Sequence, residues 1–505
     1  MQTGSAHQSE RKVTQAVTAA AHMETPMESP ITAEQDKLKA RLQSQLQKQR
    51  ESSQKNGAPD YRKRLSALDN LLTALVERQE EFVRATIEDF GGRARQETLA
   101  LELVPLAEQI RHSRKHLAGW MKSRYVGTGL NYFPSRAKVV YQPLGVVGII
   151  GAWNYQTLLT LSPLVDALAA GNHAMLKPSE LAPRTAELIK DLIAKIFPED
   201  YVTVVTGGTE VAAAFSALPF DHLMFTGSTR VGKLIMRAAS DNLTPVTLEL
   251  GGKSPALIHQ EYDLRRAAER IVTGKLYNAG QTCLAPDYLL IPQARREAFL
   301  NLFGEMVKKL YPKLVDNPDY TRIINRNHYE RLAAYVSDAR QKGAAIHQIN
   351  PANEVSDGNN RVFLPTIIFD VNDNMAVMQE EIFGPILPVI AYRTLDDAVA
   401  YVNAHPRPLA LYYFDENSAR VDHVLEHTIS GGVTINDVLF HILQHNLPFG
   451  GVGPSGMGHY HGFAGFEAFS KKKGVFLQSR MSALAILRPP YGPRAQRLIK
   501  FLLRN

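Results

Sequence analysis

The sequence predicts an α/β protein built from two lobes, each a parallel sheet covered by helices. Short apolar segments alternate with amphipathic helical segments from about residue 144 to residue 310, in two successive runs. Such alternation favours βαβ units with parallel strands. The 505 residues are 45% hydrophobic and 21% charged, which is the balance of a folded globular protein and excludes a collagen-like or wholly disordered chain.

Both runs alternate strand and helix, and this pattern predicts two Rossmann-like lobes. In the first run we expect strands at 145–150, 174–176, 201–205 and 222–225, with helices at 163–170, 184–196 and 210–218. In the second run we expect strands at 256–258 and 288–291, with helices at 264–278 and 295–310.

The chain before these runs has a different pattern. Leucines at helical spacing predict consecutive amphipathic helices over 32–123. A short β-rich segment at 132–141 predicts a strand pair. The polar residues 1–31 predict a flexible arm, with a turn or two of helix at 14–22.

Positive charge gathers at the carboxyl end. The formal net charge is +7, but nine lysines and arginines between Lys471 and Arg504 exceed this excess. The rest of the chain is slightly acidic, so we expect no nucleic-acid partner. We expect the basic tail, 479–505, to be solvated or to contact a second subunit. The alternative is weak contact with a membrane surface, because apolar residues interleave with the cations.

No targeting or membrane segment is expected. The longest apolar run, Leu144–Trp153 with its glycines counted, has ten residues, and a membrane-spanning helix needs about 20. Gln15, Thr18 and His22 interrupt the apolar core that a signal peptide would need. One cysteine excludes an intramolecular disulfide and suits a reducing cytoplasm.

That cysteine, Cys283, is the first candidate catalytic residue. It ends Gly-Gln-Thr-Cys at 280–283, between a predicted helix and a predicted strand. A lone cysteine is more often a small buried hydrophobe than a nucleophile. A glycine-containing turn on a rigid scaffold, however, is where reactive side chains meet a cleft. A nucleophilic thiol also needs a base or an electropositive setting.

Glu249 is the candidate base. It lies where an apolar strand runs into two glycines, in Leu-Glu-Leu-Gly-Gly-Lys at 248–253. The flanking leucines predict poor solvation, which raises a carboxyl pKa towards the range of a general base. The alternative is a glutamate on the exposed face of an edge strand. His427, His441 and His445 compete as bases but lack the glycine framing.

A phosphate site is predicted at 225–233. Gly227, Ser228 and Gly232 lie there between a strand and a helix, and backbone amides at a helix N-terminus face anions. The segment also matches the G-x-x-x-x-G-K core of a P-loop, but Leu234 stands where a hydroxyl must bind Mg²⁺. This argues against a nucleotide triphosphatase.

Further ligand candidates end two predicted strands. Lys177 and Glu180 could hydrogen-bond ribose hydroxyls, and a carboxylate there disfavours the 2′-phosphate of NADP. The alternative is an ordinary helix N-cap at Ser179. Asn154 could donate to a developing oxyanion, or could be a turn residue and nothing more.

In this order and spacing, six motifs strongly resemble the aldehyde dehydrogenase superfamily over about residues 35–475. They are Gly-Ala-Trp-Asn-Tyr at 151–155, Lys-Pro-Ser-Glu at 177–180, Phe-Thr-Gly-Ser at 225–228, Glu-Leu-Gly-Gly-Lys at 249–253, Gly-Gln-Thr-Cys at 280–283 and Glu-Glu-Ile-Phe-Gly-Pro at 380–385. The segment 448–462 resembles the class 3 branch, and the tail at 488–492 is most like the bacterial coniferyl aldehyde dehydrogenase group.

The resemblance implies NAD(P)-dependent oxidation of an aldehyde to its acid. Cys283 would attack the aldehyde, the Asn154 amide would stabilise the oxyanion, and Glu249 would activate water to release the acid from a thioester. Lys177 and Glu180 would contact the adenosine ribose.

Other residues of the matching motifs would complete the cofactor site. The resemblance implies that Ser228 and amides near Gly227 meet the pyrophosphate, and that Glu381 and Phe383 hold the nicotinamide ribose and ring. It also assigns Trp153, Gly232 and Leu250 to this site. NAD is the expected cofactor, and NADP stays open. No metal site is expected.

The resemblance also implies a domain plan and a homodimer. A cofactor domain would comprise 32–130 and 142–250, and a catalytic domain 251–431. An oligomerisation element would comprise 131–141 and 432–478.

The substrate class stays open between coniferyl or another aromatic aldehyde and a medium- or long-chain aliphatic aldehyde. Aromatic residues in the last third would line an apolar tunnel or pack the core; these are Phe440, Phe449, Phe463, Phe466 and Phe469. A cofactor-independent cysteine hydrolase is the alternative from a different class, and it would not need the ribose contacts.

Overall fold

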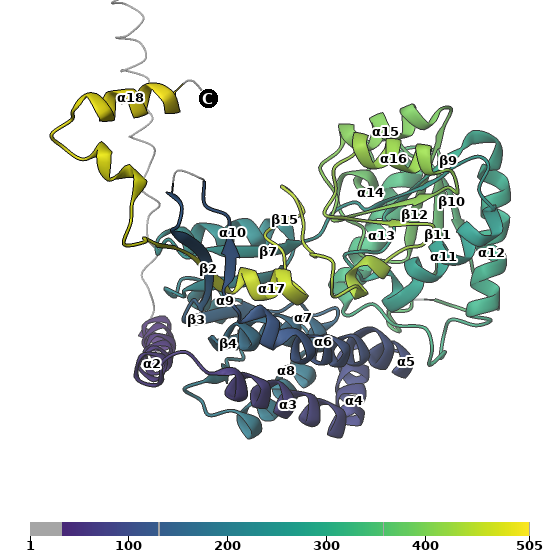
Figure 1. Cartoon of the computed structure of the whole chain (residues 1–505). Helices are drawn as coiled ribbons and strands as arrows, with labels where there is room; N and C mark the ends of the chain where they lie inside the picture. The colour runs from purple at the N-terminus through teal and green to yellow at the C-terminus, as the bar shows by residue number, and fades with distance from the viewer. Residues whose placement is uncertain (1–32, 130–131, 357, 504–505) are drawn as a thin grey trace, which may run out of the picture. The chain divides into compact units, whose positions relative to one another are not determined.

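A computed structural model describes residues 33–129, 132–356 and 358–503 (Figure 1). The chain separates into two compact units, with the boundary between Arg41 and Leu42 inside helix α2 (Ala33–Asn56). The elements described below lie in the unit that begins at Leu42. The predicted arm over 1–31, with its helical turn at 14–22, lies outside the described residues.

Consecutive helices precede the sheets, as predicted. They are α3 (Tyr61–Glu77), α4 (Gln79–Phe90), α5 (Arg95–Thr98), the π-helical turn η1 (Leu99–Leu103) and α6 (Val104–Trp120). Asp60 caps α3 by accepting from the Lys63 backbone N–H. Leu68, Leu71 and Leu75 are fully or almost fully buried, which confirms that the leucine spacing marks a core-facing stripe.

The first sheet has six strands in the order β15-β7-β6-β3-β4-β5, parallel except for β15. The strands are β3 (Val146–Ile150), β4 (His173–Lys177), β5 (Val202–Val204), β6 (His222–Gly227), β7 (Val246–Leu250) and β15 (Gly456–Met457). The order reverses direction beside β3, and ligands of such sheets bind at the carboxyl ends near this switch point.

Four helices connect these strands. They are α7 (Gln156–Ala170), α8 (Pro183–Ile196), α9 (Thr209–Ser216) and α10 (Thr229–Ser240). The prediction placed the start of the first helix at 163, seven residues too late. Nearly every residue of α7 is buried, so this helix lacks the polar face that marks an amphipathic helix in a sequence.

The second sheet has seven strands in the order β10-β11-β12-β9-β8-β13-β14, parallel except for β10. The strands are β8 (Pro255–Ile258), β9 (Tyr288–Pro292), β10 (Ala345–Gln348), β11 (Thr366–Phe369), β12 (Ile386–Tyr392), β13 (Ala410–Phe414) and β14 (Gly432–Ile435). The associated helices are α11 (Leu264–Leu276), α12 (Arg296–Leu310), α13 (Arg326–Gln341), α14 (Ala376–Gln379), α15 (Leu395–Ala404) and α16 (Ser418–His427) (Figure 1). Two parallel-sheet lobes are therefore confirmed.

A small antiparallel sheet completes the fold. Strand β2 (Arg136–Pro143) pairs with β1 (Arg124–Val126) and with β16 (Ser470–Leu477). The predicted strand pair within 132–141 is wrong, because residues 133–134 form a turn and the strand residues, 136–141, belong to one strand. The partners of β2 come from elsewhere in the chain, and no local pattern could identify them.

Segment 432–478 connects the three sheets. It contributes β14 to the second sheet, β15 to the first and β16 to the small sheet. It also forms the short helices η5 (Phe440–Leu443) and α17 (Gly462–Ala468). Beyond it lie η6 (Ala483–Leu487) and α18 (Pro493–Leu502).

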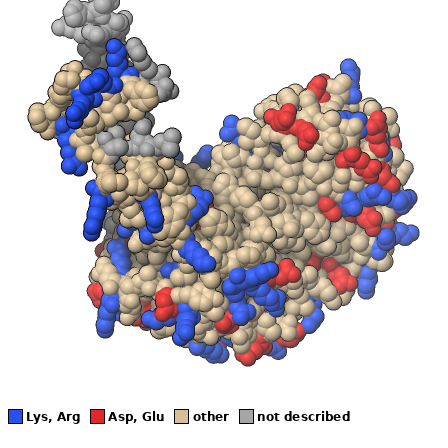
Figure 2. Space-filling view, viewed as in Figure 1, with Lys and Arg blue, Asp and Glu red and all other residues tan. Residues whose placement is uncertain are grey.

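Helix α18 carries three of the basic residues of the tail. Arg494, Arg497 and Lys500 are exposed, as are the apolar Ile499 and Phe501. Figure 2 shows lysine and arginine side chains along this helix. Within the described part of the chain, no helix combines the length and the apolar character needed to cross a membrane.

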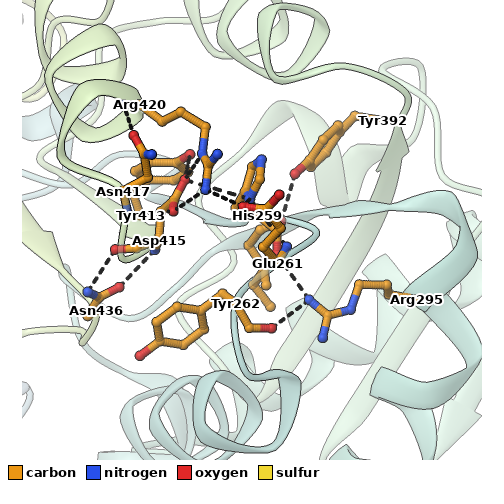
Figure 3. Close-up of polar contacts among 11 residues, drawn as sticks. His259, Glu261, Tyr262, Arg295, Tyr392, Tyr413, Asp415, Asn417, Arg420 and Asn436 are labelled. Carbon is orange, nitrogen blue, oxygen red and sulfur yellow. Dashed lines mark hydrogen bonds and ion pairs between the residues drawn. The ribbon is translucent and has the colours of Figure 1, made fainter.

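Polar side chains close the carboxyl ends of the second sheet, with Asp415 at their centre (Figure 3). Asp415 directly follows β13, and its side chain is 2% exposed. Arg420 donates to both of its carboxylate oxygens, at 2.6 and 2.9 Å, and the Tyr413 hydroxyl donates at 2.7 Å. The Asp415 main chain exchanges two hydrogen bonds with the Asn436 side chain, which follows β14. The cluster therefore ties the ends of two neighbouring strands together.

We expect Asp415→Asn to lower the free energy of unfolding by about 2 kcal/mol at neutral pH. Burial alone would raise the pKa of Asp415, but the hydrogen bonds from Arg420 and Tyr413 outweigh burial and lower the pKa to about 2. A carboxyl whose pKa is lower in the folded state stabilises the fold above its unfolded pKa near 4, and this contribution is lost as the pH falls towards 2.

Thermal unfolding midpoints measure this effect. Wild type and Asp415→Asn should differ clearly at pH 7 and converge as the pH is lowered. Asp422→Asn is the matched control, because Asp422 is exposed on the helix that carries Arg420. Equal midpoints for all three proteins at pH 7 would show that the cluster contributes nothing.

Candidate active site

The predicted site residues lie where the two large sheets meet. In the first sheet they stand at carboxyl ends: Asn154 follows β3, Lys177 ends β4 and Glu249 lies near the end of β7. In the second sheet they stand before amino ends: Cys283 precedes β9 and Glu381 precedes β12. The two sets are in contact, since the Asn154 amide donates to the Gln281 carbonyl at 3.1 Å.

The turn that carries Cys283 is unusual backbone. Asn278 and Ala279 have positive φ angles of 52° and 50°, and Gly280 follows at 73°, the left-handed region that disfavours ordinary side chains. A Cβ at Gly280 would collide with the Gly384 carbonyl. This close approach requires glycine and packs the cysteine turn against the loop that carries Glu381.

Cys283 itself is partly buried and packs against the hydrophobic core. Burial raises the pKa of its thiol, and the nearby carboxylates of Glu381 and Glu249 raise the pKa further. The backbone N–H groups of Cys283 and Leu284 act in the opposite direction. The neighbouring charges are thus anionic rather than the electropositive setting that a stable thiolate needs, so this thiol requires a base.

Glu249, the candidate base, lies close enough for its charge to act on the Cys283 thiol. It is 3% exposed, so the alternative of an exposed strand face is wrong. Both carboxylate oxygens are buried and have no hydrogen-bond partner among the described residues. Burial raises the pKa of Glu249 well above its ordinary value, as the flanking leucines predicted.

Asn154 is 2% exposed and held from both lobes. Its main-chain carbonyl accepts from Arg93 and from the Asn278 side chain, each at 3.1 Å. Arg93 in turn pairs with the buried Glu102 at 3.0 Å, and Glu102 accepts from the first amides of α7. These contacts fix the main chain of Asn154, and the hydrogen bond from its Nδ2 to the Gln281 carbonyl holds its side chain.

The predicted ribose and phosphate contacts also lie at the ends of first-sheet strands. Lys177 donates to Glu180 at 2.9 Å, so the two side chains lie side by side. Ser228 caps α10 by accepting from the Val231 backbone at 3.4 Å. A Cβ at Gly232 would lie 2.6 Å from a Leu250 methyl. This glycine therefore allows α10 to approach β7 closely.

The nicotinamide end of the predicted site has matching features. Trp153 and Phe383 contact edge to face, with ring centroids 5.3 Å apart. A Cβ at Gly251 would fall on the Glu381 carboxylate, and the Oε1 atom of Glu381 is buried without a partner among the described residues. A carboxylate with an unused acceptor beside aromatic rings suits a ribose and a nicotinamide ring. The residues present thus fit a dinucleotide.

Comparison with known proteins agrees with this geometry. Residues 8–475 match the model of the aldehyde dehydrogenase family. The chain belongs to this family. A probable coniferyl aldehyde dehydrogenase of Pseudomonas aeruginosa is 52% identical over 87% of this chain and 92% of its own length. The coniferyl aldehyde dehydrogenase of a Pseudomonas species is 47% identical over 90% of this chain and 94% of its own length.

Solved structures of aldehyde dehydrogenases share the fold. The substrate-bound structure of Staphylococcus aureus AldH matches with a TM-score of 0.85 and 37% identity, covering 91% of this chain and 99% of that chain. Betaine aldehyde dehydrogenase of the same organism, in complex with NAD⁺, matches with a TM-score of 0.79 and 25% identity over 88% of both chains. Family membership makes this chain an oxidoreductase that acts on aldehydes. It favours this activity over that of a cofactor-independent cysteine hydrolase.

The competing histidines do not contact the thiol of this aldehyde dehydrogenase. His427 lies on α16, where its ring contacts His423. His441 is paired with the Thr434 hydroxyl at 2.9 Å. His445 contacts the rings of His112 and His461. None is among the charges that act most strongly on Cys283.

The predicted aromatic residues divide between core and surface. Phe449, Phe466 and Phe469 are buried, whereas Phe440 and Phe463 are 49% and 38% exposed. Phe463 lines a surface cavity of about 260 Å³ with Trp120 and Tyr141.

Sequence reasoning missed a second layer of charged residues in this dehydrogenase. Lys253 pairs with Asp287, and Arg331 donates to the backbone carbonyls of Ile382 and Phe383. Two signals were available in the sequence: Lys253 directly follows two glycines, and Asp287 lies four residues after the cysteine. A charged residue within a predicted helix, such as Arg331, otherwise indicates a solvent-exposed helix face.

No cluster of three or more His, Cys, Asp or Glu side chains suited to a metal ion occurs in the described ranges.

Proposed function

We propose that this chain oxidises an aromatic aldehyde, with coniferyl aldehyde preferred, to its carboxylic acid with NAD⁺. The observation that carries the proposal is the convergence of Cys283, Glu249 and Asn154 at the junction of the two sheets. The two relatives above with coniferyl aldehyde in their names support the substrate class.

The first chemical step is attack on the aldehyde. Glu249 accepts the thiol proton, directly or through water, and the Cys283 sulfur bonds to the carbonyl carbon to form a thiohemiacetal. The Asn154 amide and the Cys283 backbone N–H donate to the developing oxyanion. Donors fixed before reaction stabilise such charge without reorganisation, and the hydrogen bond to the Gln281 carbonyl holds the Asn154 side-chain amide in place.

Bound NAD⁺ supplies the hydride acceptor, and loss of hydride from the thiohemiacetal leaves a thioester on Cys283. Once its first proton has passed to solvent, the Glu249 carboxylate takes a proton from water, which attacks the thioester carbon. The C–S bond breaks to release the acid, and Glu249 returns this proton to the Cys283 thiolate. Its raised pKa suits this work, because a general base acts best when its pKa lies near the operating pH.

Lys177 and Glu180 are assigned to the adenosine ribose. Ser228 and the backbone amides near Gly227 are assigned to the pyrophosphate. Trp153, Gly232 and Leu250 complete this side of the site. Glu381 and Phe383 are assigned to the nicotinamide half. The Glu180 carboxylate favours NAD over NADP, since it would repel a 2′-phosphate.

The domain plan and the assembly extend this proposal. We assign 32–130 and 142–250 to cofactor binding, 251–431 to catalysis, and 131–141 with 432–478 to a homodimer contact. Among the described strands, β16 pairs with β2 alone, and Phe476 and Leu477 are 49% and 42% exposed on it. We assign the basic tail to a subunit contact or weak membrane-surface contact, and the protein to the cytoplasm.

The substrate assignment predicts an order of specificity constants. NADH formation by the purified protein should give kcat/KM for coniferyl aldehyde about tenfold or more above that for hexanal and decanal. Benzaldehyde should lie between them, because it keeps the ring and lacks the side chain. A higher kcat/KM for the aliphatic aldehydes would retain the mechanism and assign the chain to aliphatic aldehyde oxidation instead.

A further inference from the structure

A hydrogen bond between the two lobes lies beside both assigned oxyanion donors and has no role in the scheme above. The Tyr155 hydroxyl lies 2.8 Å from the Thr282 Oγ1 atom, and the two residues are 8% and 9% exposed. Tyr155 directly follows Asn154, and Thr282 directly precedes Cys283. This hydrogen bond therefore joins the neighbours of the two residues that are assigned to stabilise the oxyanion.

The Tyr155 end of this hydrogen bond is held in the first lobe. Tyr155 is the N-cap residue of α7, and the Leu159 N–H donates to its main-chain carbonyl at 2.8 Å. The Arg93 guanidinium lies over the aromatic ring, with Cζ 4.9 Å from the ring centroid, which is the geometry of a cation–π contact. Arg93 is itself fixed, because it pairs with the buried carboxylate of Glu102 at 3.0 Å. The Tyr155 ring is therefore held at its backbone and on one face.

The Thr282 end belongs to the peptide unit that carries the Cys283 backbone N–H. The carbonyl of that peptide unit is the Thr282 carbonyl, and it accepts from the Ala285 N–H at 3.0 Å. In the preceding peptide unit, the Gln281 carbonyl accepts from the Asn154 side chain at 3.1 Å. The Thr282 side chain, through the tyrosine hydroxyl, adds a third contact at the residue between these two units. Rotation of the second unit would turn the Cys283 N–H away from the oxyanion, so its orientation matters for catalysis.

We propose that Tyr155 is a positioning residue: its hydrogen bond to Thr282 holds the Cys283 backbone N–H at a fixed spacing from the side-chain amide that completes the oxyanion site. The inference rests on the proposed function and deepens it. The two donors come from different lobes, so a hydrogen bond between their neighbours fixes the geometry in which one oxyanion meets both. Tyr155 acts through Thr282, and its hydroxyl need not touch the aldehyde.

The test is a double-mutant cycle on the oxidation of coniferyl aldehyde, with Tyr155→Phe and Thr282→Val. Each substitution removes one hydroxyl and changes the side-chain volume little. Each alone should lower kcat and kcat/KM together by about tenfold, the pattern of an interaction that acts in the transition state. The double variant should also lie about tenfold below wild type rather than about a hundredfold, since both substitutions remove the same hydrogen bond.

Two further readouts separate positioning from a structural role. Iodoacetamide alkylates a thiol by displacing iodide and forms no carbonyl oxyanion. The alkylation rate of Cys283 in Tyr155→Phe should therefore stay within about twofold of wild type, because the thiol itself is unchanged. Thr282→Ser keeps a hydroxyl and should recover most of the kcat that Thr282→Val loses. Tyr61→Phe is the matched control, since Tyr61 is 39% exposed at the start of α3, and its turnover should match wild type.

The outcomes are distinct. Additive losses of kcat in the double variant would overturn the inference, as would a parallel loss of turnover and alkylation rate in Tyr155→Phe. Wild-type turnover in Tyr155→Phe would overturn the inference and leave the proposed function intact. Absence of NADH formation by the wild type with coniferyl aldehyde, benzaldehyde, hexanal and decanal would overturn both.

Discussion

Cys283→Ala is expected to lower kcat for aldehyde oxidation by at least about 10⁴-fold, because no covalent intermediate can form without the thiol. The chain has no second cysteine to substitute for it. The Kd for NAD⁺ should stay within about twofold of wild type, since the assigned ribose contacts at Lys177 and Glu180 come from a different sheet. Steady-state NADH formation and a cofactor titration measure the two quantities.

Cys283→Ser is the matched variant, since it keeps a nucleophilic atom and changes little volume. It should also be inactive, because a buried hydroxyl beside Glu249 is far harder to deprotonate than a thiol. Turnover of Cys283→Ala near the wild-type rate would show that Cys283 is not the nucleophile, even though the family resemblance implies that it is.

Glu249→Gln should separate the two halves of the reaction. Steady-state turnover is expected to fall about 10²–10⁴-fold, the usual contribution of a general base. Glutamine cannot activate water, so the thioester should accumulate. A first turnover of NADH, slower than in wild type but close to one per subunit, should precede the slow steady state. A stopped-flow trace that shows no such burst and an undiminished final rate would identify another base.

The same variant carries a pH signature. Burial raises the pKa of Glu249 in the folded protein. A group with a raised folded pKa contributes stability that is fully present below its unfolded pKa and is lost as the pH rises through the folded pKa. Glutamine has no such dependence, so the melting temperature of Glu249→Gln should gain on wild type as the pH rises from 5 towards 8. A constant difference across this range would mean that Glu249 has an ordinary pKa.

Much of the fold follows from local patterns. Alternating apolar strands and amphipathic helices identified both parallel sheets, because each element must bury one face or both. Local sequence patterns did not predict a helix that is buried on all sides or a strand whose partners are distant in the sequence. Helix α7 is buried on all sides, so its start was missed. The 132–141 segment supplies one strand whose partners lie before it and more than 300 residues after it.

The candidate site, like the fold, was predicted in part. The poor solvation of Glu249 followed from its two leucine neighbours, and the glycine three residues before Cys283 marked a turn. Arg93 and Glu102 carried no such signal. Each is a charged residue in a segment that also suits solvent exposure. Its role is revealed by a contact with a residue more than 50 positions away, Asn154 for Arg93 and Thr157 for Glu102. Buried ion pairs are therefore the part of this site that the sequence conceals.

The central claim is that the aldehyde becomes a thioester on Cys283. The most direct measurement is acid quenching of Glu249→Gln shortly after mixing with NAD⁺ and coniferyl aldehyde, followed by tryptic peptide mass analysis. The covalent mechanism predicts one acyl group on the peptide 276–295, which holds the single cysteine, in step with the NADH formed. An unmodified peptide despite NADH formation, or an acyl group elsewhere, would contradict the mechanism.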